Sequence, residues 1–157
     1  MGKLTLGERK MFDNNLKFCR EELEMTQKEL GFVFGVSDKT IANWENAYDS
    51  IPLPKLIRFC NLYNYSVDYA LGLTKRNTLY DTKIVLNKKE LGAKLRKIRK
   101  ELHLTQKDIA DECSISRTTL TYYELGKNLI TTRSLYIFCK NHKLSADDIL
   151  RNKVSND

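Results

Sequence analysis

Side chains that commonly carry out catalysis are few in this sequence and far apart. The two histidines, His103 and His142, fall at the end of one expected helix and on the apolar stripe of another. Four cysteines form no Cys-x-x-Cys pair and have no clustered histidines nearby: Cys19, Cys60, Cys113 and Cys139. The adjacent acids Asp147 and Asp148 are typical of a first helical turn, where the helix dipole favours negative charge. We therefore expect no enzyme active site, no metal and no cofactor, and we expect the cysteines to be buried and free.

Composition narrows the class of protein. The 157 residues are 41% hydrophobic and 30% charged, and 27 Lys and Arg against 20 Asp and Glu give a net charge of +7. Such a chain can fold, and its charge is compatible with nucleic acid or another acidic surface as a partner. The longest stretch without a charged residue, 59–67, has nine residues, whereas a membrane helix needs about 20 apolar ones. Because MGKLTL at the amino terminus lacks an apolar signal core, we expect a cytoplasmic protein without a membrane segment.

The chain contains two copies of one unit. The pentapeptide TQKEL at 26–30 returns as TQKDI at 105–109. At this offset of 79, residues 16–71 pair with 95–150 without a gap and are identical at 17 of 56 positions. A repeat of this length predicts two small domains in place of a single larger one. The expected organisation is a first domain over 1–73, a linker over 74–86, a second domain over 87–152 and a tail over 153–157.

Both copies carry the same sequence of helix signals. Apolar residues spaced by three and four predict a first helix in each copy, on Phe12, Leu16, Cys19 and Leu23 and on Leu91, Leu95, Ile98 and Leu102. A hydroxyl followed three residues later by an acid predicts a capped second helix, at Thr26 with Glu29 and at Thr105 with Asp108. Serines then cap a third and a fifth helix, at Ser37, Ser116, Ser66 and Ser145. No stretch alternates long enough for a sheet, so we expect an all-α fold of two tandem five-helix domains.

These motifs resemble a known family. LGAKLRKIRKELHLTQKDIADECSISRTTLTYYELGK, followed by LSADDIL, is similar to the phage-repressor Cro/CI-type, or XRE-type, DNA-binding domain. LEMTQKELGFVFGVSDKTIANWEN with YSVDYALGL resembles it as well, so the likeness covers residues 12–73 and 91–150. The resemblance implies a lambda-repressor-like helix-turn-helix fold and a bacterial or phage transcriptional regulator. Such a protein binds double-stranded DNA sequence-specifically, and we expect it to repress by occupying an operator.

The resemblance also implies which residues meet DNA. The glutamine that opens the second helix holds a phosphate, the exposed start of the third helix reads bases, and hydroxyl and basic groups around it hold the backbone. In the second copy these residues are Gln106, Ser116, Arg117, Thr118, Thr119, Thr121, Tyr122, Lys127 and Arg133. In the first copy they are Gln27, Ser37, Asp38, Lys39, Thr40 and Asn43. Arg117 stands out, since arginine can donate two hydrogen bonds to guanine O6 and N7.

The two copies differ in charge. Residues 1–79 contain 11 basic and 10 acidic side chains, a net of +1, whereas residues 80–157 contain 16 and 10, a net of +6. The first copy also places Asp38 at the leading base-facing position and Ala47 where the second has Gly126. Because phosphate neutralisation supplies much of the affinity for DNA, we expect the second copy to be the main reader.

Aromatic residues gather in the first copy, which contains ten of the fifteen. Phe32 and Val33 occupy positions of the second helix that face outward in the family pattern. With Tyr48 or Tyr63 they would form a surface for a homodimer or a protein partner. Two alternatives stay open. A slightly rotated helix would bury Phe32, and the protein as a whole could be an antitoxin-like or inhibitor module that binds a protein through this copy.

The expected linker over 74–86, TKRNTLYDTKIVL, decides how the copies could cooperate. Thirteen extended residues reach about 40 Å, which covers the roughly 34 Å between major-groove faces one turn apart. Alternatively, KIVL could pack on one of the units. The sequence is compatible with a covalent pseudo-dimer on an asymmetric site and with a dimer through first copies whose second copies read a palindrome.

Overall fold

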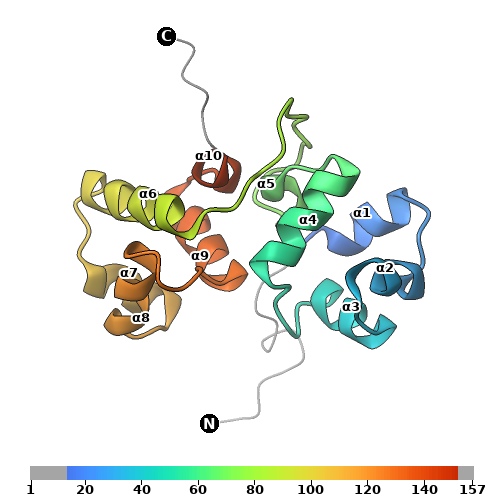
Figure 1. Cartoon of the computed structure of the whole chain (residues 1–157), viewed down its shortest axis with the longest axis horizontal. Coiled ribbons are helices and arrows are strands. Elements are labelled where there is room, and N and C mark those ends of the chain that lie inside the picture. Colours follow the sequence, from blue (N-terminus) through green and yellow to red (C-terminus); the bar gives the residue numbers. More distant parts are fainter. Residues whose placement is uncertain (1–13, 152–157) are drawn as a thin grey trace. The chain divides into compact units, whose positions relative to one another are not determined.

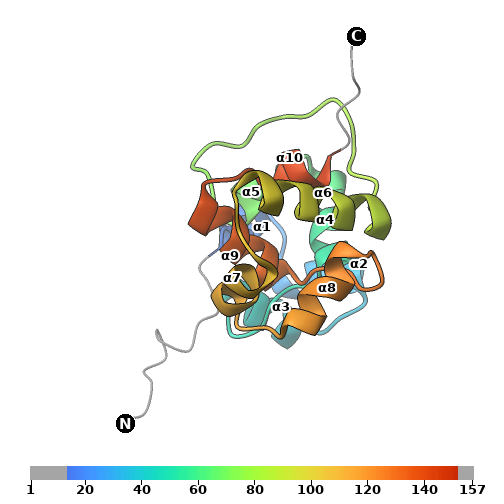
Figure 2. The ribbon, with the colours of Figure 1, turned by 90° about the vertical axis from the view of Figure 1, so that its left-hand side faces the viewer.

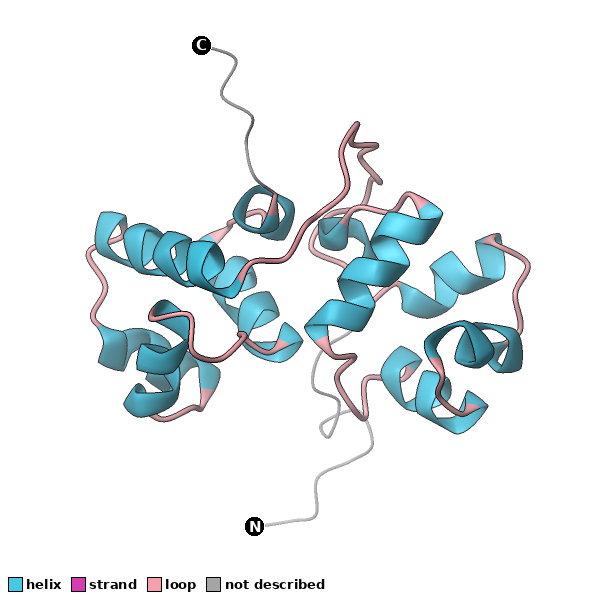
Figure 3. Cartoon of the chain, in the orientation of Figure 1, coloured by secondary structure: helices cyan, strands magenta, loops and turns pink. Residues whose placement is uncertain are grey.

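A computed structural model of the chain describes residues 14–151. Within that range it contains ten helices and no strand, in two compact units that divide between Leu79 and Tyr80 (Figures 1 and 3). This confirms the predicted all-α architecture. None of the described helices is long and apolar enough to cross a membrane. Predictions on Phe12, the amino-terminal segment and the tail lie outside the described residues.

Each unit is built from five helices in the predicted order. The first unit comprises α1 (Leu16–Glu22), α2 (Gln27–Phe34), α3 (Asp38–Glu45), α4 (Leu53–Tyr63) and α5 (Val67–Ala70). The second comprises α6 (Lys88–Glu101), α7 (Gln106–Cys113), α8 (Arg117–Glu124), α9 (Thr132–His142) and α10 (Ala146–Leu150). Within the second unit, α8 packs against both α6 and α7 (Figure 2).

Local hydrogen bonds explain where α2 and α7 begin. Thr26 Oγ1 accepts from the Glu29 amide at 3.0 Å, and Glu29 Oε1 accepts from the Thr26 amide at 3.3 Å. Thr105 and Asp108 make the same reciprocal pair at 3.1 and 2.8 Å. The hydrogen bond from the Thr105 backbone holds the pKa of Asp108 below its usual value. Both predicted capping boxes are therefore present, and each satisfies amides that a helix start leaves without partners.

The turn between the second and third helices uses a left-handed residue in each unit. Gly35 adopts φ 67° after α2, and Ser114 adopts φ 54° after α7. Ser37 Oγ and Ser116 Oγ then accept from the amides of Thr40 and Thr119, which confirms both as caps of the third helix. The tight turn thereby fixes where α3 and α8 start.

The third helix of the second unit, α8, lies very close to the first helix of that unit, α6. A Cβ atom added to Gly92 of α6 would stand 2.3 Å from the Tyr123 carbonyl oxygen and 2.7 Å from that of Glu124. Gly126, in the turn that follows α8, adopts φ 72°, and its added Cβ would be 2.7 Å from Lys89 Cα. Ala47 adopts the same left-handed conformation in the first unit, with φ 59°. Glycine at 92 and 126 thus allows α6 and α8 to touch through their backbones.

The core of each unit is apolar and contains the cysteines. Ile41 and Trp44 of α3 are buried, as are Leu120 and Tyr123 of α8. All four cysteines are free and buried. Burial raises the pKa of the Cys19 thiol to about 12. A thiol in that state has little nucleophilic thiolate at neutral pH, so it acts as a small hydrophobic side chain.

Much of the segment expected to be a free linker is held by its own unit. Asn77 Oδ1 accepts from the Ser66 amide at 2.7 Å, which ties this stretch to the first unit. On the other side, the Arg151 guanidinium lies 3.8 Å from the ring centre of Tyr80 and donates to the Thr82 carbonyl, while Ile84 is buried. The packed form of KIVL, left open by the sequence, is the one observed at Ile84. Residues 78–79 remain between the two anchored stretches.

Candidate nucleic-acid interface

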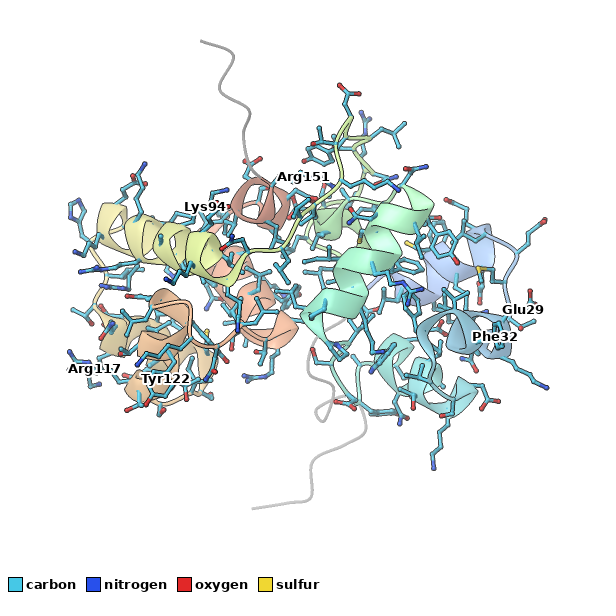
Figure 4. All side chains as sticks on the ribbon, in the orientation of Figure 1. Glu29, Phe32, Lys94, Arg117, Tyr122 and Arg151 are labelled. Carbon is cyan, nitrogen blue, oxygen red and sulfur yellow. The ribbon has the colours of Figure 1, made fainter. Side chains whose placement is uncertain are left out.

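The outer face of α8 presents the residues predicted to read DNA. Arg117 and Thr118 are exposed in its first turn, and Tyr122 follows one turn later with 40% of its surface exposed (Figure 4). Thr121 lies between them and is half-buried. Because the opposite face of α8 is anchored in the core, this face is held rigidly toward solvent. A helix presented in this way can enter a major groove.

Gln106, the first residue of α7, connects this face to the interior. Its Nε2 donates to Glu124 Oε1 at 3.2 Å. Its Oε1 accepts from Arg117 Nε at 3.2 Å. The Thr121 hydroxyl lies 3.4 Å from this oxygen and donates its proton to the Arg117 carbonyl at 2.9 Å. Gln106 therefore contacts two of the residues predicted to face DNA, and one of its own N–H groups is used within the protein.

A buried ion pair lies behind Gln106. Arg99 of α6 donates from Nε to Glu124 Oε2 at 2.7 Å and from Nη2 to Glu124 Oε1 at 3.0 Å. Its Nη1 donates to the Leu104 carbonyl at 2.9 Å. The hydrogen bond to Glu124 raises the pKa of Arg99 above its usual value. Arg99 thereby joins α6, the start of α7 and the end of α8 through charge-assisted hydrogen bonds.

The first unit contains the same ion pair. Arg20 Nε donates to Glu45 Oε2 at 2.5 Å, and Arg20 Nη1 donates to the Met25 carbonyl at 2.7 Å. Sequence reasoning missed both pairs, although a signal was present. Arginine and glutamate are each identical between the copies at these positions, and a charged residue retained in both copies on a core-facing helix indicates a buried partner.

Residues predicted to hold the DNA backbone surround α8. The hydroxyls of Ser116 and Thr119 are 2.8 Å apart at its start. Lys127 is exposed beyond its end, with Nζ 5.3 Å from the centre of the Tyr122 ring. Arg133 is half-buried and donates from Nη1 to the Cys113 carbonyl at 2.6 Å, at the end of α7. The structure thus places Lys127 beside Tyr122 on the outer face of α8, and it places Arg133 in a hydrogen bond that holds the end of α7.

Comparison with known protein families identifies the same two helix-turn-helix units. A family model described as "Helix-turn-helix" matches residues 16–69, and one described as "Helix-turn-helix domain" matches residues 92–154. The chain is a tandem of two helix-turn-helix domains. The family predicted from the Cro/CI-type motifs is confirmed for both copies.

Two relatives come from Bacillus subtilis (strain 168). The "HTH-type transcriptional regulator ImmR" is 32% identical over 77 residues, which are 47% of this chain and 56% of that protein. The "Uncharacterized HTH-type transcriptional regulator YobD" is 33% identical over 64 residues, which are 41% of this chain and 57% of that protein. The chain therefore spans about half the length of these relatives.

The first helix-turn-helix domain presents a different surface on α3. Asp38 and Lys39 are exposed at its start, and Asn43 is half-buried one turn later. The hydroxyls of Ser37 and Thr40 are 3.0 Å apart, as in the second domain. This face therefore contains one acid and one base where the second domain has Arg117 and Thr118.

Gln27 of the first domain donates to Glu45 Oε1 at 3.1 Å, as Gln106 does to its own glutamate. However, Asp38 and Ala42 stand where Arg117 and Thr121 stand in the second domain. Neither side chain has a hydrogen-bond donor at neutral pH. The amide oxygen of Gln27 therefore lacks a donor like the arginine that meets Gln106.

Phe32 lies on the outer side of α2 and exposes 89% of its surface, near Glu29 (Figure 4). The inner face of α2 is filled by Leu30 and Phe34, so the rotated helix that would bury Phe32 is not found. Val33 is half-buried and Tyr48 is 43% exposed. A phenylalanine that is exposed to this degree is a candidate for contact with another protein surface.

Among residues 14–151, no group of three or more histidine, cysteine or acidic side chains could hold a metal ion. The polar side chains at the interface instead hold helix starts and face solvent. This arrangement suits recognition of a charged polymer.

Proposed function

We propose that this protein is a sequence-specific transcriptional regulator that binds double-stranded DNA in the cytoplasm and represses by occupying its operator. The exposed face of α8 carries the proposal, because its core-anchored helix presents Arg117 beside hydroxyl and aromatic groups. The names of the two relatives, both regulators of the HTH type, support it. The proposed function needs no catalytic step and no cofactor.

The second domain would do most of the reading. Arg117 would donate to a guanine, Thr118, Thr121 and Tyr122 would contact neighbouring bases or sugars, and the remaining predicted residues would hold phosphates. Those residues are Gln106, Ser116, Thr119, Lys127 and Arg133. The net charge of +6 over residues 80–157 favours this domain for phosphate neutralisation. The first domain would add weaker contacts through Gln27, Ser37, Lys39, Thr40 and Asn43, with Asp38 restricted to accepting from a cytosine amino group.

Selection of genomic DNA fragments tests the proposal. The full chain should enrich a defined motif, and Arg117→Ala should lose the preference for at least one base pair, by about tenfold. Asn43→Ala, at the corresponding face of α3, is the matched control and should retain that preference. The same motif and affinity in both variants would show that neither third helix reads bases.

A salt titration of the same complex provides the electrostatic control. About six phosphate contacts predict a slope near −5 in a plot of log affinity against log salt concentration. A flat slope would contradict binding to the DNA backbone and favour the protein-binding module.

The exposure of Phe32 supports a second role, in which the first domain forms a homodimer or engages a protein partner. Phe32→Asp should convert a self-associating protein into a monomer, as measured by sedimentation, because burying a carboxylate in an apolar contact is costly. Phe18→Asp, a 55% exposed position on α1, is the matched control. An unchanged sedimentation profile and unchanged partner binding in the Phe32 variant would refute this surface.

A further inference from the structure

A row of basic side chains on α6 borders the end of α8 in the second domain. We infer that Lys89, Arg96 and Lys100 hold the phosphate backbone of the duplex that α8 enters. This inference rests on the proposed function and extends its interface to a helix outside the helix-turn-helix. These three residues are called the α6 stripe.

The stripe begins beside the turn that follows α8. A Cβ atom added to Gly126 in that turn would be 2.7 Å from Lys89 Cα and 3.0 Å from Lys89 Cγ. One turn further along α6, Gly92 meets the last carbonyls of α8, and Arg99 then pairs with Glu124. The line from Lys89 to Arg99 therefore lies against the end of α8.

Helix geometry places the rest of the stripe on the solvent side of this line. At about 3.6 residues per turn, Arg96 lies roughly 40° around α6 from Gly92, and Lys100 lies roughly 80° from it. Both are turned away from the buried side chain of Leu95. All three stripe residues are exposed. The stripe thus starts at the turn that also carries Lys127, which is predicted to hold the DNA backbone.

No residue within 14–151 neutralises the stripe. Two other lysines of α6 do have partners. Lys94 Nζ donates to the Ile149 and Arg151 carbonyls at 3.2 and 2.8 Å, and Lys97 Nζ lies 4.0 Å from Glu101 Oε1. The stripe side chains form no hydrogen bond or ion pair in the described part of the chain. Their charge is therefore available to a partner.

The stripe charges are unfavourable for α6 itself. Lys89 lies in the first turn of the helix, where the helix dipole disfavours a positive charge. Arg96 and Lys100 are four residues apart, so their like charges repel each other across one turn. A polyanion would relieve both effects, and DNA carries its phosphates in a regular line.

The length of the stripe suits this line. From Lys89 to Lys100 the helix rises about 16 Å at roughly 1.5 Å per residue. Successive phosphates of one DNA strand advance about 3.4 Å along the axis. The three side chains can therefore contact different phosphates.

The first domain lacks the stripe. At the positions of Arg96 and Lys100 it has Lys17 and Glu21, whose charged groups are 4.0 Å apart. Opposite charges at this spacing stabilise a helix and leave no net charge for a polyanion. The fold therefore does not require two cations here, and they are particular to the domain proposed to bind DNA more strongly.

The test replaces the stripe by glutamine in the full chain, as Lys89→Gln, Arg96→Gln and Lys100→Gln together. Affinity for the selected operator is measured against salt concentration. Three contacts added to about six around α8 predict a log–log slope of about −8 for the unchanged chain, and the variant should be less negative by about 2.7. The loss should be equal on operators with altered base pairs, because phosphate contacts carry no sequence information.

A control variant removes the same charge elsewhere in the second domain. Lys97→Gln, Lys140→Gln and Lys143→Gln change exposed lysines on another edge of α6 and at the opposite end of α9 from Arg133. This variant should keep the slope of the unchanged chain. An equal change in both variants would assign the effect to overall charge and overturn the inference. An unchanged slope in the stripe variant would also overturn it.

Further measurements separate the remaining outcomes. The stripe variant should melt at the same temperature or higher, because a like-charge pair has been removed. Ethylation of single phosphates should identify positions that block the unchanged chain and no longer affect the stripe variant. Loss of binding to phosphatidylglycerol vesicles with an unchanged slope on DNA would assign the stripe to a membrane surface and overturn the inference. If the unchanged chain binds no duplex, the proposed function fails as well, whereas an unchanged slope overturns the inference alone.

Discussion

Glu124→Ala is expected to unfold the second domain while the first stays folded. Removing the carboxylate leaves the Arg99 guanidinium, whose side chain is 11% exposed, without a counter-charge inside the protein. Breaking a buried pair in this way costs about 3–5 kcal/mol of unfolding free energy, a large part of what a small domain possesses. The single tryptophan, Trp44, lies in the first domain. Its fluorescence should retain its normal denaturation midpoint while far-ultraviolet circular dichroism shows an early loss of helix.

A double variant distinguishes an unpaired charge from general damage. Arg99→Met with Glu124→Leu removes both charges and should recover most of the lost stability, because well-packed apolar residues often replace a buried pair at little cost. A loss below about 1 kcal/mol in Glu124→Ala alone would mean that the pair behaves like one on the surface.

The second large effect is expected at Gly92. In Gly92→Ala the new methyl group would overlap the Tyr123 and Glu124 carbonyl oxygens, which belong to α8 backbone and cannot move aside alone. Overpacking of this kind costs about 1–3 kcal/mol, and α8 must shift to relieve it. We therefore expect lower stability of the second domain together with weaker base discrimination.

Gly35→Ala is the matched control for the substitution itself. Gly35 has φ 67° but no atom within 4 Å of an added Cβ. Alanine there should cost about 1 kcal/mol through backbone conformation alone, visible in the Trp44 signal. Equal losses at both positions would show that contact between α6 and α8 is not the cause at Gly92.

Local signals predicted most of the fold. The pair Thr26 and Glu29 caps the start of α2, and Ser116 caps the start of α8. The residues of each cap lie within four positions of one another, so the helix starts can be predicted from the sequence. The order of such signals in two copies was specific enough to identify the helix-turn-helix domain. The outward faces of the third helices followed from the resemblance to the Cro/CI-type family.

Contacts between distant residues were harder to predict. Arg99 and Glu124 are 25 residues apart, and hydropathy gives no sign that two charges meet inside a domain. The second role of Gln106 was hidden for the same reason, because its partners are assembled only when α7 and α8 cross. The exposure of Phe32 could not be predicted for a different reason. It depends on the rotation of α2 about its axis, which is set by the burial of Leu30 and Phe34 of the same helix.

The segment that joins the two domains can have two different effective lengths, a short one while it is anchored and a longer one when it is released. From Asn77 to Tyr80 the chain makes three Cα steps, so it spans about 11 Å while both sides are anchored. Polar contacts at Ser66, Thr82 and the Tyr80 ring hold these anchors together with the buried side chain of Ile84. Each hydrogen bond contributes about 0.5–1.5 kcal/mol, and burial of an isoleucine side chain contributes about 1.5–3 kcal/mol. Release of the whole segment would extend the reach toward about 40 Å at the cost of these contacts. The span of the tandem is therefore coupled to the stability of its anchors. Under the proposed binding of DNA by both domains, widely spaced half-sites would be bound at an affinity reduced by the cost of release.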